Sequence, residues 1–423
     1  MKNCTLATFV SLVFILTQLI FILTWKDMGK IAGTLCSRFA IDRSFDEPLP
    51  PNARAASGSI PSARSFKKHR IDYKLEAEIL GGIPPRTWQP VLMDHVCYPV
   101  EERWWHNSVQ RKPAKRGLLF VKEMKTGSSS IAGIVLRIAR NLPKRFGFDF
   151  EQCSSRVDHT PARVMDYKNR NVDESFLFTF LREPSARYLS QFFHFKVSRE
   201  KFEPSDKVIQ EYFLNTVYLH DYYLRELSLI EYPAKQLSPD ELSLHRVKAV
   251  NAIVRNYDFI GITERMDESL VVMQILLNLP TSDLLYIKAK SKGGFDDGAF
   301  NHTCFYIVPS FTSSGMKNWF ENSTTWNTKI RGDEMLYEVA NRSLDLTIDA
   351  LGRDSFEEKL QRFRRAQTLA REKCSAGLKL PCSSNGIRAK VLDINKFECD
   401  CLWLDSGCGY KCLDAISEEV DNM

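Results

Sequence analysis

The chain has 423 residues, 11 cysteines and a formal net charge of +6, and 44% of its residues are hydrophobic and 26% charged. These proportions are ordinary for a globular protein, and the length suits one large domain or two smaller ones. The mild basic excess suits an anionic ligand, but no long run of Lys or Arg accompanies it, so nucleic acid is not an expected partner.

Residues 5–25 carry no charge and are long enough to cross a bilayer. A cleaved signal peptide has a shorter apolar core and a small-residue cleavage site, and here only Ile31-Ala32-Gly33 weakly resembles such a site. We therefore predict a retained transmembrane signal anchor at 5–25, after a short cytosolic tail at 1–4. The flanking lysines are nearly balanced, so their charge does not fix the orientation.

Residues 26–85 are rich in Ser, Pro, Ala and Arg and contain few apolar runs. This composition is typical of a flexible stem that holds a folded domain away from a membrane. The basic cluster Arg64–Arg70 is interpreted as solvated linker, with a contact to a headgroup or polyanion as the alternative. Ordered structure is expected to begin near Trp88.

The stretch Gly117–Arg140 predicts a strand, a Gly/Ser turn and a helix. An apolar run, Gly117–Val121, forms the strand, and the turn is Lys125–Ser130. This order aims backbone N–H groups and a positive helix N-terminus at an anion, and the lysine and hydroxyls add charge and donors. We therefore predict a phosphate-binding loop. The apolar positions at helical spacing are Ile131, Ile134, Val135 and Ile138.

The residue order in this turn differs from the loop of nucleotide triphosphatases. That loop carries its Lys after the second Gly, whereas here Lys125 precedes Gly127. The next apolar run, Phe176–Leu181, is followed by Arg182 and not by an acidic residue that holds Mg²⁺. Such a site suits a phosphate-bearing donor whose transfer needs no metal.

Further along the chain, strand patterns alternate with helix patterns, which indicates an α/β fold with a largely parallel sheet. In open sheets of this class, ligands bind beyond the carboxyl ends of the strands. The remaining predicted strands are Asp258–Thr263 and Leu284–Ile287, and the predicted helices are one that starts at Pro184, several over 207–256, one at Met266–Leu279 and a charged helical region over 334–373.

Cysteines crowd the chain from Cys374 onward. Their spacings lack paired C-x-x-C or C-x-x-H, so disulfides are favoured over a zinc site, although the pairing is not determined. Disulfides imply an oxidising lumen or the exterior, which predicts a type II membrane protein with a lumenal C-terminal side. Sequons at Asn301, Asn322 and Asn341 agree. The crowded cysteines are Cys374, Cys382, Cys399, Cys401, Cys408 and Cys412.

Three separated segments resemble the Golgi carbohydrate sulfotransferases, closest to the heparan sulfate 2-O/6-O branch. Phe120–Ser130 resembles their 5′-phosphosulfate loop, Phe180–Ser190 resembles their 3′-phosphate motif, and Asp258–Glu268 is similar to a later strand. Met124 stands where the family usually has Pro or His, and Gly127 where it often has Ala. Neither departure removes a charged group.

The resemblance implies a P-loop nucleotide-kinase-like sulfotransferase fold, with a central parallel sheet flanked by helices. It also implies the sulfuryl donor 3′-phosphoadenosine 5′-phosphosulfate (PAPS) and no required metal. By resemblance, Lys125 contacts the bridging oxygen and the 5′-phosphosulfate, and Arg182 and Ser190 hold the 3′-phosphate. The residues implied to cradle the 5′ end are Thr126, Gly127, Ser128, Ser129 and Ser130.

Sulfuryl transfer to a sugar hydroxyl needs a base, positive charge at the leaving phosphate, and reactants held in line. Lys125 can serve the leaving group. His159 is the predicted base, because the family has a catalytic His between the two phosphate motifs and no other His lies in that interval. A structural histidine is the alternative, and Asp158, Glu151 and His220 are the other candidate bases.

Two sets of basic residues keep two interpretations each. Arg187 either pairs with a partner in its own helix or contacts a ligand. Lys288, Lys290 and Lys292 either meet an anionic glycan or the donor's 3′-phosphate, or lie in a solvated loop.

The sequence thus predicts a PAPS-dependent carbohydrate O-sulfotransferase of the Golgi membrane. Its lumenal domain would span 86–373, followed by a cysteine-rich, disulfide-bonded extension at 374–423. The acceptor is left open among polysaccharides, proteoglycans and glycolipids. A non-catalytic lumenal glycan-binding protein on the same fold is the alternative function.

Overall fold

The computed structural model describes residues 82–92, 96–99, 115–216, 220–232, 237–288, 294–296, 304–376, 378, 382–387 and 407–423. These residues all belong to one unit, formed by Tyr73–Glu101 and Lys112–Met423. The predicted cytosolic tail, the predicted anchor at 5–25 and nearly all of the predicted stem lie outside the described residues. Within the part that is described, no helix combines the length and apolarity that a membrane span requires.

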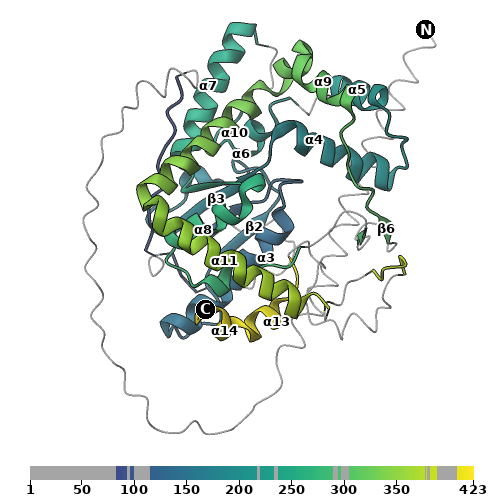
Figure 1. Cartoon of the computed structure of the whole chain (residues 1–423). Helices are drawn as coiled ribbons and strands as arrows, with labels where there is room; N and C mark the ends of the chain where they lie inside the picture. The colour runs from purple at the N-terminus through teal and green to yellow at the C-terminus, as the bar shows by residue number, and fades with distance from the viewer. Residues whose placement is uncertain are drawn as a thin grey trace, which may run out of the picture. The chain divides into compact units, whose positions relative to one another are not determined.

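Four parallel strands form the centre of the fold, in the order β2-β1-β3-β4 (Figure 1). Three of them are wholly buried runs that the sequence predicted, and they confirm the α/β class with a central parallel sheet. The edge strand β2 is half-buried and lacks an apolar run, so the sequence did not predict it. The strands are β1 (Gly117–Val121), β2 (Ser155–Asp158), β3 (Ser175–Leu181), β4 (Phe259–Ile262) and an antiparallel pair, β5 (Phe295–Asp296) and β6 (Phe305–Tyr306).

Helices surround the central sheet, with α3 packed on β1 and β2 and with α8 and α10 packed on β4. The helices expected over 207–256 and 334–373 are present. The principal helices are α3 (Ser128–Phe146), α4 (Pro184–Phe192), the π-helix η3 (Phe193–Arg199), α5 (Asp206–Asn215), α6 (Tyr222–Leu227), α7 (Pro239–Asn256), α8 (Met266–Leu276), the 3₁₀ turn η6 (Thr281–Leu284), α9 (Ser314–Asn322), α10 (Thr324–Leu351), α11 (Arg353–Cys374), α13 (Tyr410–Ala415) and α14 (Ser417–Asp421).

The predicted strand at Leu284–Ile287 is wrong. Leu284 ends the 3₁₀ turn η6, and the backbone groups of the next two residues bond mainly to side chains and pair with no strand. Gln367 of α11 bonds both the N–H and the C=O of Tyr286, and Arg137 of α3 donates to the C=O of Leu285. This apolar run is therefore buried by packing between helices. Periodicity alone does not distinguish such a segment from a buried strand of a sheet.

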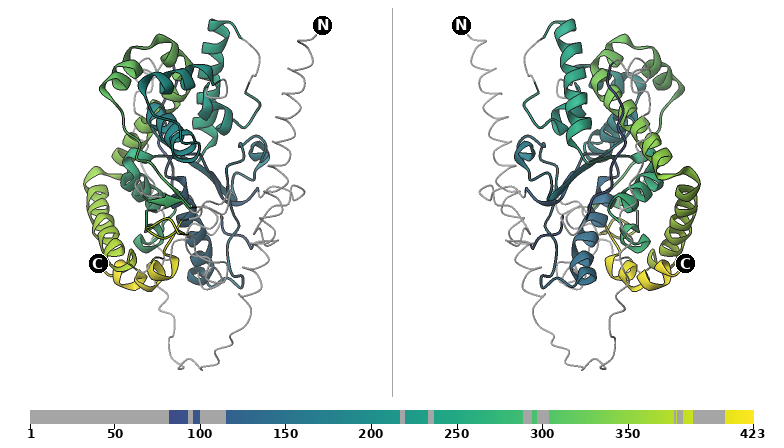
Figure 2. Two further views of the ribbon diagram at one scale, coloured as in Figure 1. Left: turned by 90° about the vertical axis from the view of Figure 1, so that its right-hand side faces the viewer. Right: turned by 90° about the vertical axis from the view of Figure 1, so that its left-hand side faces the viewer.

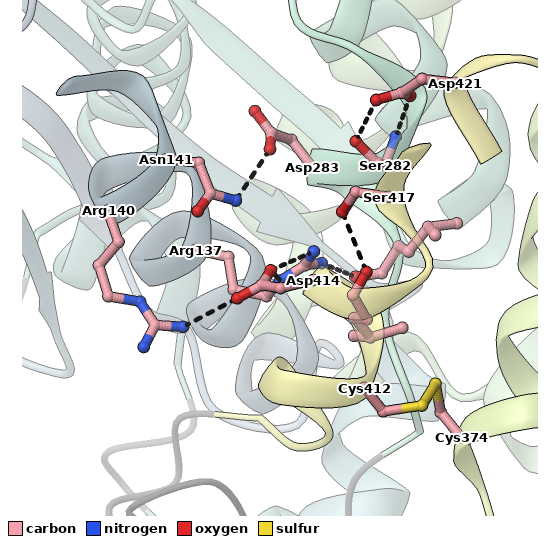
Figure 3. A network of polar contacts seen from close by, with 12 residues as sticks. Arg137, Arg140, Asn141, Ser282, Asp283, Cys374, Cys412, Asp414, Ser417 and Asp421 are labelled. Atoms are coloured by element: carbon pink, nitrogen blue, oxygen red, sulfur yellow. Dashed lines mark hydrogen bonds and ion pairs between the residues drawn. A yellow bond between two sulfur atoms is a disulfide. The ribbon is translucent and has the colours of Figure 1, made fainter. Parts of the chain in front are cut away.

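The C-terminal helices α13 and α14 pack against α3, η6 and the end of α11 (Figure 2). Asp414 of α13 binds the buried Arg137 of α3, and Asp421 accepts hydrogen bonds from the backbone and hydroxyl of Ser282 (Figure 3). The cysteine-rich region therefore contributes to the packing around the helix that follows the predicted phosphate loop.

Disulfide bonds are present, as predicted, and they connect the C-terminal region to the rest of the domain. One of them joins α11 to α13, and another reaches back from the C-terminal region to the segment before β6. Cys399 and Cys401 fall outside the described residues. The pairs found among the residues described are Cys97–Cys153, Cys304–Cys382 and Cys374–Cys412.

Candidate functional site

The carboxyl ends of the parallel strands meet at one edge of the sheet. Val121 at the end of β1 pairs with Asp158 of β2 on one side and with Thr179 of β3 on the other. The loop after β1 therefore lies between the residues that follow β2 and β3, which are His159 and Arg182. The sheet order brings these three predicted segments to the same edge, where α/β sheets bind ligands.

The turn after β1 is held in an uncommon backbone conformation. Lys125 and Gly127 both have positive φ, 69° and 72°, and Thr126 between them is buried. The Thr126 hydroxyl donates to the C=O of Glu123 at 3.1 Å, and its C=O accepts from the Thr263 hydroxyl at 2.8 Å. A left-handed conformation is costly for a lysine, so these contacts maintain a strained turn. Turns of this kind form concave anion-binding surfaces from backbone N–H groups.

Helix α3 begins at this turn with an open N-terminus. Gly127 is the N-cap, no side chain caps the helix, and its first turn has no acidic residue. By contrast, the Glu183 carboxylate caps α4 by accepting two backbone N–H groups. An uncapped end leaves N–H groups and positive dipole charge available to an anion. Ser128 at this end is buried, and Ser129 and Ser130 are half-buried.

Arg182 joins this loop to the end of β3. Its Nη1 donates to the C=O of Lys125 at 3.3 Å, and its Nε lies 3.8 Å from Glu264 Oε1. Its backbone N–H and C=O both bond the hydroxyl of Tyr223, at 3.0 and 2.8 Å. Ser190 is half-buried on α4, and no hydrogen bond joins its side chain to that of Arg182 in this structure. The loop and Arg182 are thus in contact, while Ser190 stays a prediction.

His159 and Asp158 differ in how their side chains are engaged. Asp158 lies 2.5 Å from Arg156 Nη2 and accepts hydrogen bonds from the backbone and hydroxyl of Thr160, at 3.1 and 3.0 Å. His159 is the next residue along and its side chain is exposed. The imidazole is thus the more exposed of the two groups, and its role as the base stays a prediction.

The other two candidate bases lie in different surroundings. Glu151 is exposed just ahead of β2, toward the amino end of that strand and away from the edge where the loops meet. His220 Nδ1 lies 3.2 Å from Asp221 Oδ2, which also accepts from Arg246 Nε at 2.8 Å. His220 therefore belongs to an ion cluster at the start of α6.

Two carboxyl groups beside the loop were missed in the sequence. Glu123, two residues before Lys125, is almost wholly buried, and burial and the nearby Glu226 raise its pKa well above the ordinary value. Burial also raises the pKa of Glu226, which interacts electrostatically with His159. A carboxylate two residues after a buried strand was the available signal for Glu123. Nothing in the sequence pointed to Glu226.

Arg187 is fully buried and lies among aromatic rings. Its guanidinium carbon is 4.0 Å from the ring centre of Tyr188 and 3.9 Å from that of Tyr222. Its Nη1 donates to Gln191 of the same helix at 3.0 Å. This environment supports a structural role for Arg187 and not a contact with a ligand.

At this edge of the sheet, the available groups are mainly positive charges and hydrogen-bond donors. Lys288 is exposed after the wrongly predicted strand, and the structure gives no account of Lys290 and Lys292. In the described ranges no group of three or more His, Cys, Asp or Glu side chains is arranged to hold a metal ion. What the edge offers chemically is a cradle for an anion beside an exposed histidine.

Comparison with known proteins relates the chain to sulfotransferases of galactose-containing molecules. Bovine galactosylceramide sulfotransferase is 24% identical over 295 residues, which cover 62% of this chain and 65% of that protein. Human galactose-3-O-sulfotransferase 3 is 22% identical over 340 residues, which cover 72% and 73%. Human galactosylceramide sulfotransferase is 23% identical over 293 residues, which cover 62% and 65%. No family model matches the chain.

The matched stretch spans about 65% of the length of the galactosylceramide sulfotransferases. These similarities support a carbohydrate sulfotransferase, and the observed α/β fold is consistent with that family. They do not single out the heparan sulfate 2-O/6-O branch that the sequence motifs resembled.

Proposed function

We propose that the protein is a PAPS-dependent carbohydrate O-sulfotransferase. The observation that carries this proposal is the meeting of the strained Lys125 turn, the open N-terminus of α3 and Arg182 at one edge of the sheet. The similarity to sulfotransferases supports it. The alternative, a non-catalytic glycan-binding protein on the same fold, gives no reason for a turn strained around a lysine.

The residues present fit a donor with phosphate at both ends. In our proposal the 5′ end lies against Lys125–Ser130, where the open helix end offers N–H groups and positive charge. The guanidinium of Arg182, whose side chain is 23% exposed, binds the 3′-phosphate together with Ser190. PAPS supplies the sulfuryl group and a phosphate leaving group when it is bound.

In the proposed chemistry, one residue of this chain accepts a proton and another stabilises a developing negative charge. The imidazole of His159 accepts the proton of the acceptor hydroxyl, whose oxygen forms the new bond to sulfur. The ammonium of Lys125 stabilises the negative charge that develops on the leaving phosphate. Neither role draws on a metal, and none is part of the proposal.

For the acceptor we propose a galactose-containing glycan or glycolipid, because the relatives are named for galactose and galactosylceramide. We place the enzyme in the Golgi membrane as a type II protein with a lumenal domain, a location that its disulfides suit. Of the sequons, Asn322 is exposed at the end of α9 and is the proposed glycosylation site. Asn341 lies within α10 and accepts a hydrogen bond from Arg265, so its amide is already engaged.

The deciding experiment is transfer of ³⁵S-labelled sulfate from PAPS to a panel that includes galactosylceramide, galactose-terminated oligosaccharides and heparan chains, followed by linkage analysis. Transfer to a galactose acceptor is expected. Lys125→Ala and His159→Ala should each lower turnover by about 100-fold or more, because each removes charge stabilisation or proton transfer. Lys144→Ala, at the other end of α3, is the matched control and should keep full activity.

Binding of the desulfated product, 3′-phosphoadenosine 5′-phosphate (PAP), is measured in parallel by calorimetry. The His159→Ala protein should bind PAP as tightly as the wild type although its turnover is lowered. A wild-type protein that binds no PAP would refute the donor assignment. Full activity in His159→Ala would transfer the role of base to Asp158.

A further inference from the structure

We propose that two adjacent tyrosines at the start of α6, Tyr222 and Tyr223, position the two phosphate-binding halves of the donor site. The inference rests on the proposed function and assigns positioning roles, since neither hydroxyl is suggested to touch the donor. Each hydroxyl reaches a different segment at the carboxyl edge of the sheet. One bonds the end of β3 at Arg182, and the other lies beside the carboxyl group of Glu123 in the loop after β1.

The Tyr223 hydroxyl fixes the backbone of Arg182. It accepts the N–H of Arg182 at 3.0 Å and donates to the C=O of the same residue at 2.8 Å. Arg182 is the first residue after β3, so its backbone groups have no strand partner. The Tyr223 hydroxyl bonds these groups instead. Tyr223 is fully buried, and its ring has no room to shift without disturbing the core. This hydroxyl therefore fixes the backbone from which the Arg182 side chain extends.

The Tyr222 hydroxyl lies beside the carboxyl group of Glu123 in the loop after β1. Glu123 is 2% exposed, and its Oε2 atom has no hydrogen bond of its own. The backbone C=O of Glu123 in turn holds the hydroxyl of Thr126, within the strained turn around Lys125. Loss of the Tyr222 hydroxyl would leave a buried carboxyl group without this support, and the loop would have to move to hydrate it.

Both tyrosines are held by one carboxylate on α10. Asp333 accepts the backbone N–H groups of Tyr222 and Tyr223, at 3.0 and 2.8 Å, and the hydroxyl of Tyr188 at 2.8 Å. The guanidinium of Arg187 lies 3.9 Å from the ring of Tyr222 and 5.6 Å from that of Tyr223. The start of α6 is therefore held in place, and from it the two tyrosine hydroxyls extend to the two halves of the site. We call this pair of tyrosines, with Asp333, the bracket.

The consequence is a separation of effects between the two ends of the donor. A change at Tyr223 should act on recognition of the 3′-phosphate through Arg182, and a change at Tyr222 on the 5′ end through the loop. A general loss of packing would weaken both ends alike. The probes that distinguish these cases are PAP, adenosine 5′-phosphate and adenosine 3′-phosphate, which carry both phosphates or only one.

The test is calorimetric titration of the full-length protein with the three nucleotides. For Tyr223→Phe, we expect the Kd for PAP and for adenosine 3′-phosphate to rise about fivefold, with adenosine 5′-phosphate unchanged. For Tyr222→Phe, PAP and adenosine 5′-phosphate should weaken by about the same factor, with adenosine 3′-phosphate unchanged. Tyr257→Phe is the matched control, because its buried hydroxyl donates to the C=O of Leu227 at the other end of α6.

The outcomes separate this inference from the proposed function. If the wild-type protein binds none of the three nucleotides, the proposed donor site itself is refuted. Wild-type binding, with both variants affecting the two single-phosphate probes equally or not at all, would overturn the bracket and leave the enzyme assignment intact. If either Phe variant does not fold, Asp333→Asn supplies the second test. It loosens the start of α6 and should weaken both single-phosphate probes together, and unchanged affinities would again overturn the proposal.

Discussion

Arg137 and Arg187 are the two most deeply buried arginines among the described residues, and their surroundings differ. Arg137 of α3 donates through Nε and Nη2 to Asp414, at 3.0 and 2.8 Å, and through Nη1 to the C=O of Leu285 at 2.9 Å (Figure 3). Arg187 of α4 lies between tyrosine rings, donates to Gln191, and keeps Nε and Nη2 without hydrogen-bond partners. One buried cation is satisfied by oxygen atoms, and the other is largely enclosed by π systems.

The difference shows two ways in which the fold supports the loop between β1 and α3. On the Arg137 side, ion pairs and hydrogen bonds fasten α3 to the C-terminal helices, and Asp283 adds bonds to Arg145 and Asn141. These pairs include partly exposed groups, such as Asp414 with 40% of its side chain accessible. On the Arg187 side, the cluster is wholly internal and includes Asp333. We expect internal charge to be the more costly to unbalance.

The largest effect is expected at Arg187. Arg187→Ala removes the positive charge near Asp333 and Glu123, two buried carboxyl groups, and should lower the free energy of unfolding by about 3–5 kcal/mol. Urea denaturation measures this loss. Arg187→Lys is the control for charge alone, and an intermediate loss is expected because an ammonium lacks the planar stacking surface. A loss below about 1 kcal/mol in the alanine variant would contradict the comparison, since surface substitutions reach that range.

The next effect concerns the disulfide that fastens the C-terminal helices. Replacing both Cys374 and Cys412 by Ala opens a bond that closes a sequence separation of 38 and should cost about 2–4 kcal/mol. Limited proteolysis should then cut first near α13. The double Ala variant of Cys97 and Cys153 is the control, and its C-terminal helices should keep their protection. Equal protection in both variants would show that the ion pairs hold the region without the disulfide.

A smaller loss is expected at Asp414. Asp414→Asn leaves the buried Arg137 with the C=O of Leu285 but no carboxylate, and should cost about 2 kcal/mol, less than a fully internal pair because Asp414 is partly exposed. The double variant Arg137→Met with Asp414→Leu removes both charges and should be more stable than Asp414→Asn alone. If the double variant is the less stable of the two, the pair contributes more than it costs to bury.

The most gradual expected effect is a pH dependence on the Arg187 side, because it is spread over several pH units. Burial and the nearby Asp221 raise the pKa of Asp333 to about 7, opposed by Arg187. Its value in an unfolded chain is about 3.9, so the folded state binds this proton more tightly. Stability from this group is therefore greatest at low pH and falls as pH rises from about 4 to 7, by at most about 1.4 kcal/mol per pH unit.

Denaturation curves at several pH values in this window, for wild type and Asp333→Asn, measure that slope. The variant cannot ionise at this position and should lose part of the pH dependence. The same series on Asp414→Asn is the comparison from the other side of α3. Identical slopes in wild type and Asp333→Asn would show that the carboxyl group is ionised throughout the window.

The central strands were predictable because they are continuous apolar runs, as in Gly117–Val121 and Ser175–Leu181. The edge strand Ser155–Asp158 was not, because an edge position next to solvent tolerates alternating polar residues. The apolar run Leu284–Ile287 was predicted as a strand, but Gln367 and other side chains satisfied its backbone. The local sequence pattern predicts that a segment is buried. It does not predict which groups will form hydrogen bonds with the backbone of that segment.

The candidate site divides in the same way. The Lys125 turn and Arg182 were predictable because each follows a recognisable strand, and parallel pairing brings strand ends together. The positions of Glu123 and Tyr223 were not, since they depend on a short helix that Asp333 holds from more than 100 residues away. Sequence alone shows the residues at the edge of a sheet, while the groups that support them come from elements with no local signal of proximity.

The bond between Arg137 and Asp414 also has a consequence for synthesis of the protein. The two residues are 277 positions apart. At a ribosomal rate of roughly 5–20 residues per second, the carboxylate follows the guanidinium after roughly 15–55 s. Throughout that interval Arg137 of the nascent α3 lacks its final carboxylate acceptor. The helix that follows the proposed phosphate loop is therefore made early, but its contacts are completed only when the C-terminal helices have been made.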